Sequence, residues 1–135
     1  MENKFKHMDY IQNVISRMAS NSFCMKGWDI TLIAAIMAVS IKEIDWRVCV
    51  CCILLNVAFW VLDAYYLRQE KLFRKLYSKV TKETDDKKID FSMDTSSFQK
   101  EVKNVFLLAL WNISTTPLYA SITAVLMAII YIKKY

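Results

Sequence analysis

The sequence contains very little glycine, proline or histidine, and each shortage excludes a class of function. Its 135 residues include one glycine (Gly27), one proline (Pro117) and one histidine (His7). A phosphate-binding loop needs several glycines so that backbone N–H groups can approach the anion, so neither a Walker loop nor a dinucleotide fingerprint can form. A single histidine leaves no histidine-based metal cluster. We therefore expect no enzyme activity, no cofactor and no metal.

Cysteine is also scarce and unevenly placed. Cys49, Cys51 and Cys52 lie close together at the start of an apolar run, and Cys24 lies apart from them. No second Cys-x-x-Cys pair accompanies them, which disfavours a zinc site. The favoured interpretation is that they are small apolar residues that allow helices to approach closely, with a redox-active or lipidated cysteine as the alternative.

Charge is missing from three long segments. Val105–Ile132 contains no charged residue, Val48–Leu67 contains only Asp63, and Gly27–Ile41 contains only Asp29. A helix needs about 20 apolar residues to cross a bilayer. Because 23% of the chain is nevertheless charged, its charges are concentrated outside these runs. This segregation predicts an all-α membrane protein that forms a single membrane domain.

The first half of the chain predicts an N-terminal amphipathic helix followed by a helical hairpin. Apolar residues recur at steps of three and four over residues 5–25, which indicates the amphipathic helix. We expect the first span at residues 23–41 and the second at 48–67, with the polar segment 42–47 between them. An apolar face continues beyond the second span, so we expect that helix to extend to about residue 81 as a cytoplasmic stalk.

The second half predicts a linker and a third helix. Residues 82–97 break the helical pattern and form a cytoplasmic linker. Ser96 followed by Gln99 is typical of a capping box, so a new helix is expected to start there and to cover residues 98–132. Pro117 should split it, because proline removes a backbone hydrogen bond. We expect an interfacial or kinked piece to about Ser114 and then a short span over residues 117–132. The residues leave open whether this segment crosses the membrane or re-enters on the same side.

Positive charge predicts the orientation. Of the 18 lysines and arginines, 14 lie before residue 27 or within residues 68–104. By the positive-inside rule, the N-terminus and residues 68–104 are cytoplasmic. Lys133 and Lys134 would then lie outside if the third segment crosses, whereas a re-entrant segment would remove this exception.

A basic stripe follows the predicted stalk. Its residues recur at steps of three and four, with one arginine beside them: Arg68, Lys71, Arg74, Lys75, Lys79 and Lys82. One interpretation is a membrane anchor whose side chains reach lipid phosphates. The other is a cationic collar, formed when several copies surround an axis, that binds an anionic nucleotide or oligonucleotide. The predicted ligand-binding residues are Arg68, Lys71, Arg74, Lys75 and Lys79.

Polar residues inside the apolar runs indicate a pore or gate, at Asp63, Asn112, Thr115 and Thr116. For Asp63 the alternative is a partner for Lys26 or Arg68 at the interface, and Lys26 is also spaced to pair with Asp29. Thr115 and Thr116 can bond the carbonyls that Pro117 frees. Three spans do not enclose an aqueous path, so a channel requires a closed ring of copies.

Three stretches carry a resemblance to a known family. They are HMDYIQNVISRMASNSFCMKGWDITLIAAIMA, FWVLDAYYLRQEKLFRKLY and IDFSM, and together they span about residues 7–92. These stretches resemble small SLATT-like bacterial membrane effectors of anti-phage defence, most closely those of the Hailong type. The resemblance implies a homo-oligomeric channel, a tetramer in the Hailong case. A nucleotidyltransferase encoded nearby makes single-stranded DNA oligomers that hold such a channel closed. Their removal opens the channel, depolarises the membrane and stops growth.

Two functions remain open besides a regulated ion channel. The chain can be a non-conducting membrane adaptor that anchors a soluble defence or signalling partner through residues 68–104. A small multidrug-type transporter is less favoured, because the chain has only three predicted spans and a large cytoplasmic portion.

Overall fold

The computed structural model contains helices and connecting segments, and no strands, over the residues that it describes. These are residues 1–135, apart from the side chain of Phe106. The elements are α1 (Glu2–Val39), α2 (Trp46–Lys82), two 3₁₀ turns (Asp86–Lys88 and Ser96–Phe98), α3 (Val105–Trp111) and α4 (Thr116–Lys134). Three of them, α1, α2 and α4, are long and apolar enough to cross a membrane. The prediction of an all-helical protein with three such helices is confirmed.

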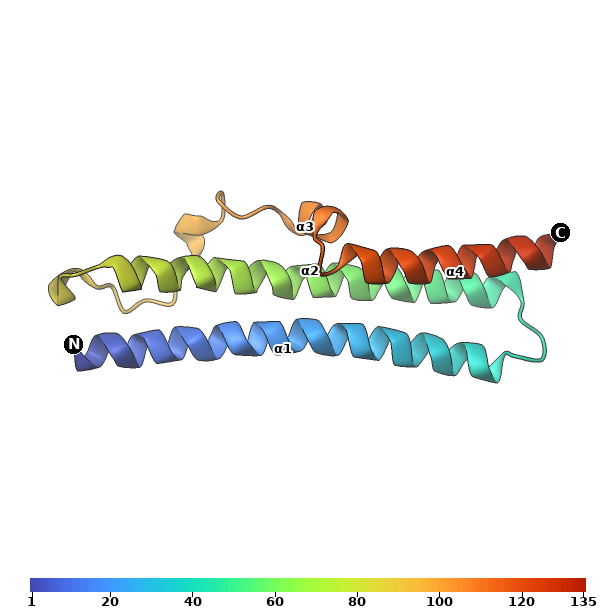
Figure 1. The fold of residues 1–135 in the computed structure, drawn as a ribbon, viewed down its shortest axis with the longest axis horizontal. Coiled ribbons are helices and arrows are strands. Elements are labelled where there is room, and N and C mark those ends of the chain that lie inside the picture. Colours follow the sequence, from blue (N-terminus) through green and yellow to red (C-terminus); the bar gives the residue numbers. More distant parts are fainter.

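The long helices lie side by side in an elongated bundle (Figure 1). The chain runs along α1, returns along α2, and then reaches α3 and α4 through the linker that follows α2. Helix α4 packs along the first half of α2, so the C-terminus lies at the same end as the α1–α2 loop (Figure 1). Helix α3 is short and runs across the long helices.

Helices α1 and α2 are each continuous, with 38 and 37 residues. At 1.5 Å per residue they are each about 55 Å long, whereas the hydrocarbon core of a bilayer is about 30 Å thick. The predicted amphipathic helix 5–25 and first span 23–41 therefore form one element. The second span continues into the predicted stalk, which ends at Lys82. Asp45 starts α2 as its N-cap by accepting a hydrogen bond from the backbone N–H of Arg47 at 3.3 Å.

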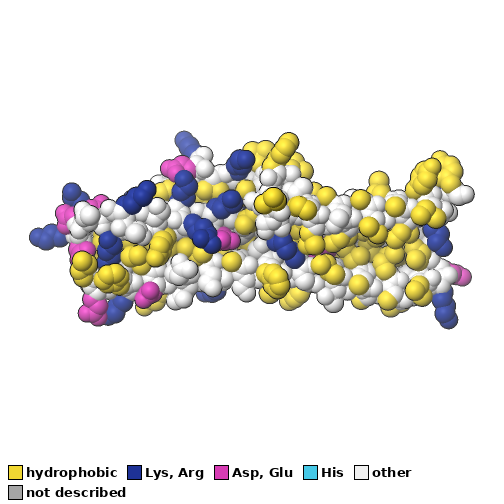
Figure 2. All heavy atoms as spheres, in the orientation of Figure 1, with side chains coloured by type: hydrophobic (Ala, Val, Ile, Leu, Met, Phe, Trp, Pro, Cys, Tyr) yellow, Lys and Arg dark blue, Asp and Glu magenta, His cyan; other side chains and the backbone are white. Residues whose placement is uncertain are grey.

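Charge divides the bundle into two halves along its length (Figure 2). The charged half contains residues 2–26 and 68–104, and the apolar half contains residues 27–67 and 116–132 with charges at its tip. Large hydrophobic side chains such as Leu54 (66% exposed) cover the outside of the apolar half. An exposed apolar surface of this extent is typical of a surface that contacts lipid and not water.

Each half has its own core. In the charged half, Ile11 and Ile15 of α1 pack against Leu76 and Val80 of α2, and Ile89 of the linker covers them. In the apolar half, one side chain from each long helix meets the others: Ile33, Cys52 and Leu126. Burying an aliphatic side chain in the water-exposed half contributes about 1.5–3 kcal/mol, so the stalk holds α1 against α2 beyond the membrane.

The third segment is divided near Pro117 as expected, since helix α3 ends at Trp111 and α4 begins at Thr116. The expected helix start at residue 98 is wrong, because α3 begins at Val105. The turn at Ser96 ends at Phe98, because the carbonyls of Gln99 and Lys103 accept hydrogen bonds from Arg68, at 3.3 Å each, in place of helical N–H groups. Asn104 then starts α3, since its side chain accepts from the N–H of Leu107 at 3.1 Å.

The break between α3 and α4 is closed by hydroxyl groups. Thr116 donates to the carbonyl of Ala109 at 3.0 Å, and Thr115 donates to the carbonyl of Leu108 at 3.4 Å. The expected hydrogen bonding of carbonyls by these two threonines is therefore observed. Pro117 lies in the first turn of α4, where its missing N–H removes no helical hydrogen bond.

The single glycine provides a test of how α1 is packed. Gly27 is helical, and a Cβ atom added to it would meet nothing within 4 Å. Gly27→Ala should therefore raise the free energy of unfolding by about 0.5–1 kcal/mol, since alanine loses less backbone entropy in a helix. Denaturant unfolding in detergent measures the change. A loss of stability would mean that another copy of the chain packs against this position.

Candidate functional site

A group of polar side chains is buried where the charged and apolar halves meet. The group comprises Ser22, Lys26 and Asp29 from α1, Asn56 and Asp63 from α2, and Tyr119 from α4. We call it the polar layer. Ser22 and Asp29 lie seven residues apart, as do Asn56 and Asp63, so each pair shares one face of its helix. The two faces meet because α1 and α2 are antiparallel.

An ion pair connects α1 to α2 at the inner edge of the polar layer. Lys26 Nζ lies 2.6 Å from Asp63 Oδ2, and Ser22 Oγ donates to Asp63 Oδ1. Lys26 also donates to Ser22 Oγ at 3.1 Å. The carboxylate of Asp63 is fully buried, and the Lys26 side chain is 19% exposed. The structure thus pairs Asp63 with Lys26 and not with Arg68, and the predicted pair between Lys26 and Asp29 is wrong.

Hydrogen bonds from α2 fix the position of α4. Asn56 Nδ2 donates to the carbonyl of Tyr119 at 3.1 Å and to Thr123 Oγ1 at 2.8 Å. Trp60 stacks on the ring of Tyr119 at 5.9 Å between centroids, and its Nε1 donates to the carbonyl of Ala109 at 2.7 Å. One face of α2 therefore connects α3 and α4 to the polar layer.

Several oxygen atoms of the polar layer have no hydrogen-bond partner in the part of the chain that the structure describes. They are both carboxylate oxygens of Asp29 and Oδ1 of Asn56, and both side chains are fully buried. The buried hydroxyl of Tyr119 lies close to the carboxylate of Asp63. Burying such groups without partners costs about 1–3 kcal/mol each. Ionisable residues inside a membrane are by default candidates for an ion pathway.

The other predicted pore or gate residues lie outside the polar layer. Asn112 ends α3, and its side chain accepts from the N–H of Ser114 at 2.8 Å. Thr115 is fully buried, and with Thr116 it bonds the carbonyls of α3 as described above. The three residues shape the connection between α3 and α4. Their role as a gate remains a prediction.

A groove of about 740 Å³ lies between the stalk and α3. Its basic lining comes from Lys71, Arg74, Lys75 and Lys103, and its other lining residues include Glu101, Leu107, Trp111 and Asn112. We call it the basic groove. It contains three of the five predicted ligand-binding residues, but neither Arg68 nor Lys79. Lys103 was missed in the sequence because it lies in a connecting segment without a helical repeat.

Most of the predicted basic stripe has partners within the chain. Arg68 donates to the side chain of Gln99 at 2.7 Å as well as to two linker carbonyls. Lys75 pairs with Glu101 at 3.2 Å, Arg74 pairs with Glu70 at 2.8 Å, and Lys79 lies 5.9 Å from the ring centroid of Phe98. Arg68 is therefore a structural clamp between stalk and linker.

Two basic side chains of the groove remain available for a ligand. Lys71 and Lys103 form no ion pair with any described residue, and both line the groove.

In the segment between α2 and α3, Ser96 donates its N–H and hydroxyl to Asp94, which lowers the pKa of that carboxyl. Asp94 is thus negatively charged at neutral pH, and it lies outside the basic groove.

No group of three or more His, Cys, Asp or Glu residues is placed to hold a metal ion within the described residues, and all four cysteines are free. Cys49 and Cys52 are buried between helices, and Cys24 and Cys51 are exposed. Comparisons of the chain with protein-family models, with curated proteins and with solved structures find no match.

Proposed function

We propose that several copies of this chain form a regulated ion channel in the bacterial inner membrane, which acts as an effector of anti-phage defence. The observation that carries the proposal is the polar layer. Its unpartnered oxygens on Asp29 and Asn56 lie on helices that can cross a membrane. Hydrated ions pass through membranes where such groups meet in an assembly. One chain does not enclose a path, so we propose a ring of copies, a tetramer by the resemblance to Hailong-type effectors. Because these oxygens are buried within one chain, the described arrangement is the closed state, and opening separates the helices around them.

The basic groove supports regulation by an anion. A phosphate bound between Lys71 and Lys103 would hold the stalk against the segment that precedes α3. Helix α3 is joined to α4 through Thr116 and to α2 through Trp60. A polyanion in the groove would therefore restrain the helices around the polar layer. The resemblance favours a single-stranded DNA oligomer or nucleotide as the inhibitor, supplied by a nucleotidyltransferase encoded nearby.

Expression of the chain alone is the first test of the channel. Without its anionic inhibitor the protein should collapse the membrane potential, as read by a potential-sensitive dye. Co-expression of the nucleotidyltransferase should restore the potential. A chain that inserts in the membrane and assembles but leaves the potential intact would favour the alternative, a membrane adaptor that anchors a soluble partner through residues 68–104.

Charge reversal tests the basic groove separately. Lys71→Glu with Lys103→Glu should weaken binding of a short single-stranded DNA by at least about tenfold at low salt, because both free lysines contact phosphates. The matched control, Lys87→Glu with Lys88→Glu, removes the same charge from the linker turn outside the groove. Fluorescence anisotropy on purified protein measures both. Equal losses in the two variants would exclude the groove as the binding site.

A further inference from the structure

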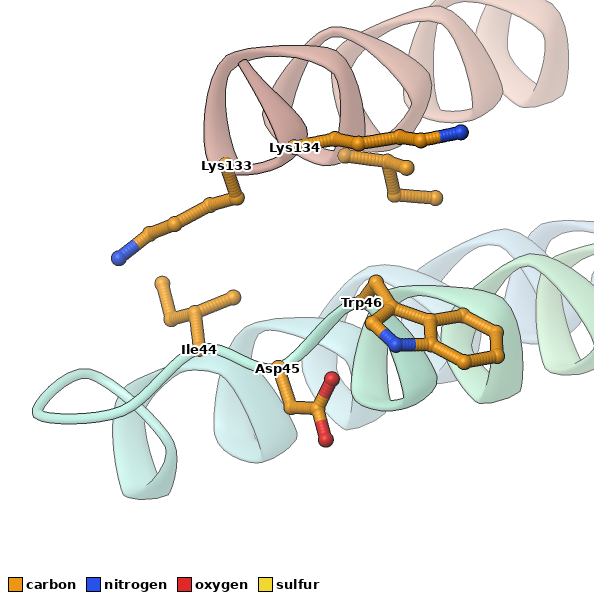
Figure 3. A pocket seen from close by; sticks show the side chains of 6 residues that line it. Ile44, Asp45, Trp46, Lys133 and Lys134 are labelled. Carbon is orange, nitrogen blue, oxygen red and sulfur yellow. The ribbon is translucent and has the colours of Figure 1, made fainter.

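A second pocket lies at the opposite end of the bundle, between the α1–α2 loop and the end of α4 (Figure 3). Its volume is about 470 Å³, and its lining residues are Ile44, Asp45, Trp46, Ile130, Lys133 and Lys134. Neither the polar layer nor the basic groove contributes to it. We call it the tip pocket.

The available charge of the tip pocket is positive. Lys133 and Lys134 form no ion pair within residues 1–135 as described. Asp45 is already engaged, because it caps α2 through the N–H of Arg47 and its carboxylate lies 4.0 Å from Arg47 Nε. Lys133 points across the gap toward Ile44, whereas Lys134 points the other way along α4 (Figure 3). The ammonium group of Lys133 is therefore free to bind an anion at the rim of the pocket, and Lys134 adds positive charge nearby.

The rest of the pocket is apolar. Ile44 and Lys133 point toward one another across the gap, and the ring of Trp46 lies beside it at the start of α2 (Figure 3). Ile130 adds a second aliphatic wall from α4. An anion that binds here therefore contacts hydrocarbon on one side and the ammonium group of Lys133 on the other. This combination selects an amphiphile over a fully hydrated ion.

The position of the pocket matches the boundary of a membrane. The apolar run of α4 ends at Ile132, directly before the two lysines, and Trp46 precedes the apolar run of α2. Tryptophan and lysine are typical of the membrane–water interface. An apolar groove of about 300 Å³ between α1 and α4, which includes Met37 and Ile129, offers space for an acyl chain nearby.

We propose that the tip pocket binds an anionic phospholipid, with its phosphate at Lys133, its glycerol backbone against Ile44, Trp46 and Ile130, and the charge of Lys134 adding to the attraction. Basic pockets between membrane helices bind anionic headgroups in this way. The bound lipid connects the α1–α2 loop to the end of α4. The inference is independent of the proposed channel function, because it concerns a different end of the molecule.

Native mass spectrometry of the full-length protein in detergent tests the proposal. With equal amounts of phosphatidylglycerol and phosphatidylcholine, the protein should retain phosphatidylglycerol about fivefold better or more. Lys133→Gln with Lys134→Gln should abolish this preference. The matched control, Lys87→Gln with Lys88→Gln in the linker turn, should keep it. Equal retention of both lipids, or a preference that survives the loss of Lys133 and Lys134, overturns the proposal.

Two further measurements separate a lipid pocket from surface charge and from a site for free phosphate. Ile130→Trp fills the pocket without changing its charge, and it should reduce phosphatidylglycerol retention severalfold. Retention equal to that of the unmodified protein would overturn the pocket. Excess inorganic phosphate should leave the lipid bound, because it lacks the apolar contacts. Complete displacement by phosphate would assign the site to the free anion and overturn the lipid.

Discussion

Asp63→Ala is expected to lower the free energy of unfolding by about 3–5 kcal/mol, the largest effect that we predict for one side chain. The substitution leaves the ammonium group of Lys26, which is 19% exposed, without its partner at 2.6 Å. It also removes the acceptor for the buried hydroxyl of Ser22. Removing one partner of a buried ion pair is costly, because the remaining charge stays buried without compensation. Denaturant unfolding of the purified protein in detergent measures the loss.

The ion pair is expected to be replaceable as a unit. Lys26→Met combined with Asp63→Leu should recover most of the stability that Asp63→Ala loses, since a buried apolar pair of similar volume substitutes well for an ion pair. Glu2→Ala is the control, because it breaks the exposed pair with Lys6 and should cost less than about 1 kcal/mol. Equal losses for Asp63→Ala and Glu2→Ala would show that Asp63 is hydrated in the assembled protein.

Asp29→Leu is expected to raise the free energy of unfolding, whereas Asp63→Ala lowers it, and to abolish conduction. Both oxygens of Asp29 are buried without a partner among the described side chains. Replacing the carboxylate by a hydrocarbon of similar size should therefore raise the free energy of unfolding by about 1–3 kcal/mol. If the polar layer is the ion path, the same variant should lower the ion flux in reconstituted vesicles by at least about tenfold. Greater stability with lost activity is the pattern expected of a functional residue.

Asp29→Asn separates the polarity of this position from its charge. Asparagine keeps the shape and the hydrogen-bonding capacity, so we expect ion flux between that of the unmodified protein and that of Asp29→Leu. Unchanged flux in both variants, in protein that still assembles, would exclude Asp29 from the path. A loss of stability in Asp29→Leu would instead indicate that the carboxylate has a partner in the ring of copies.

The spans and the stalk could be predicted from the sequence because they depend on local patterns. The long runs with little or no charge give α2 and α4 their apolar surfaces, and steps of three and four extend α2 to Lys82. The start of the third segment was harder to predict. Its helix does not start at Ser96, because Arg68, 31 residues before Gln99 and 35 before Lys103, bonds the carbonyls there. A contact of this separation leaves no periodic signal.

The candidate sites show the same limit. Lys26 and Asp29 have the spacing of a helical ion pair, but the partner of Lys26 lies 37 residues away on the antiparallel helix. The sequence shows that the residues of the basic stripe share one helical face. That Glu70, Glu101 and Gln99 bind three of its side chains depends on the fold. Asp63 was recognised as an unusual charge in an apolar run. Its place beside Tyr119 of α4 required the packing of all three long helices.

The unbroken course of α1 and α2 has a mechanical consequence. No interruption of the helical backbone separates the water-exposed part of either helix from its apolar part. Lys4 and the N-terminal ammonium group, which bind the carbonyl of Glu83 and the side chain of Asp86, tie the far ends together. A tilt imposed on this tied end should therefore appear, in the opposite direction, at the α1–α2 loop. The two helices can transmit an event at the charged end of the bundle to the apolar end without a separate sensor domain.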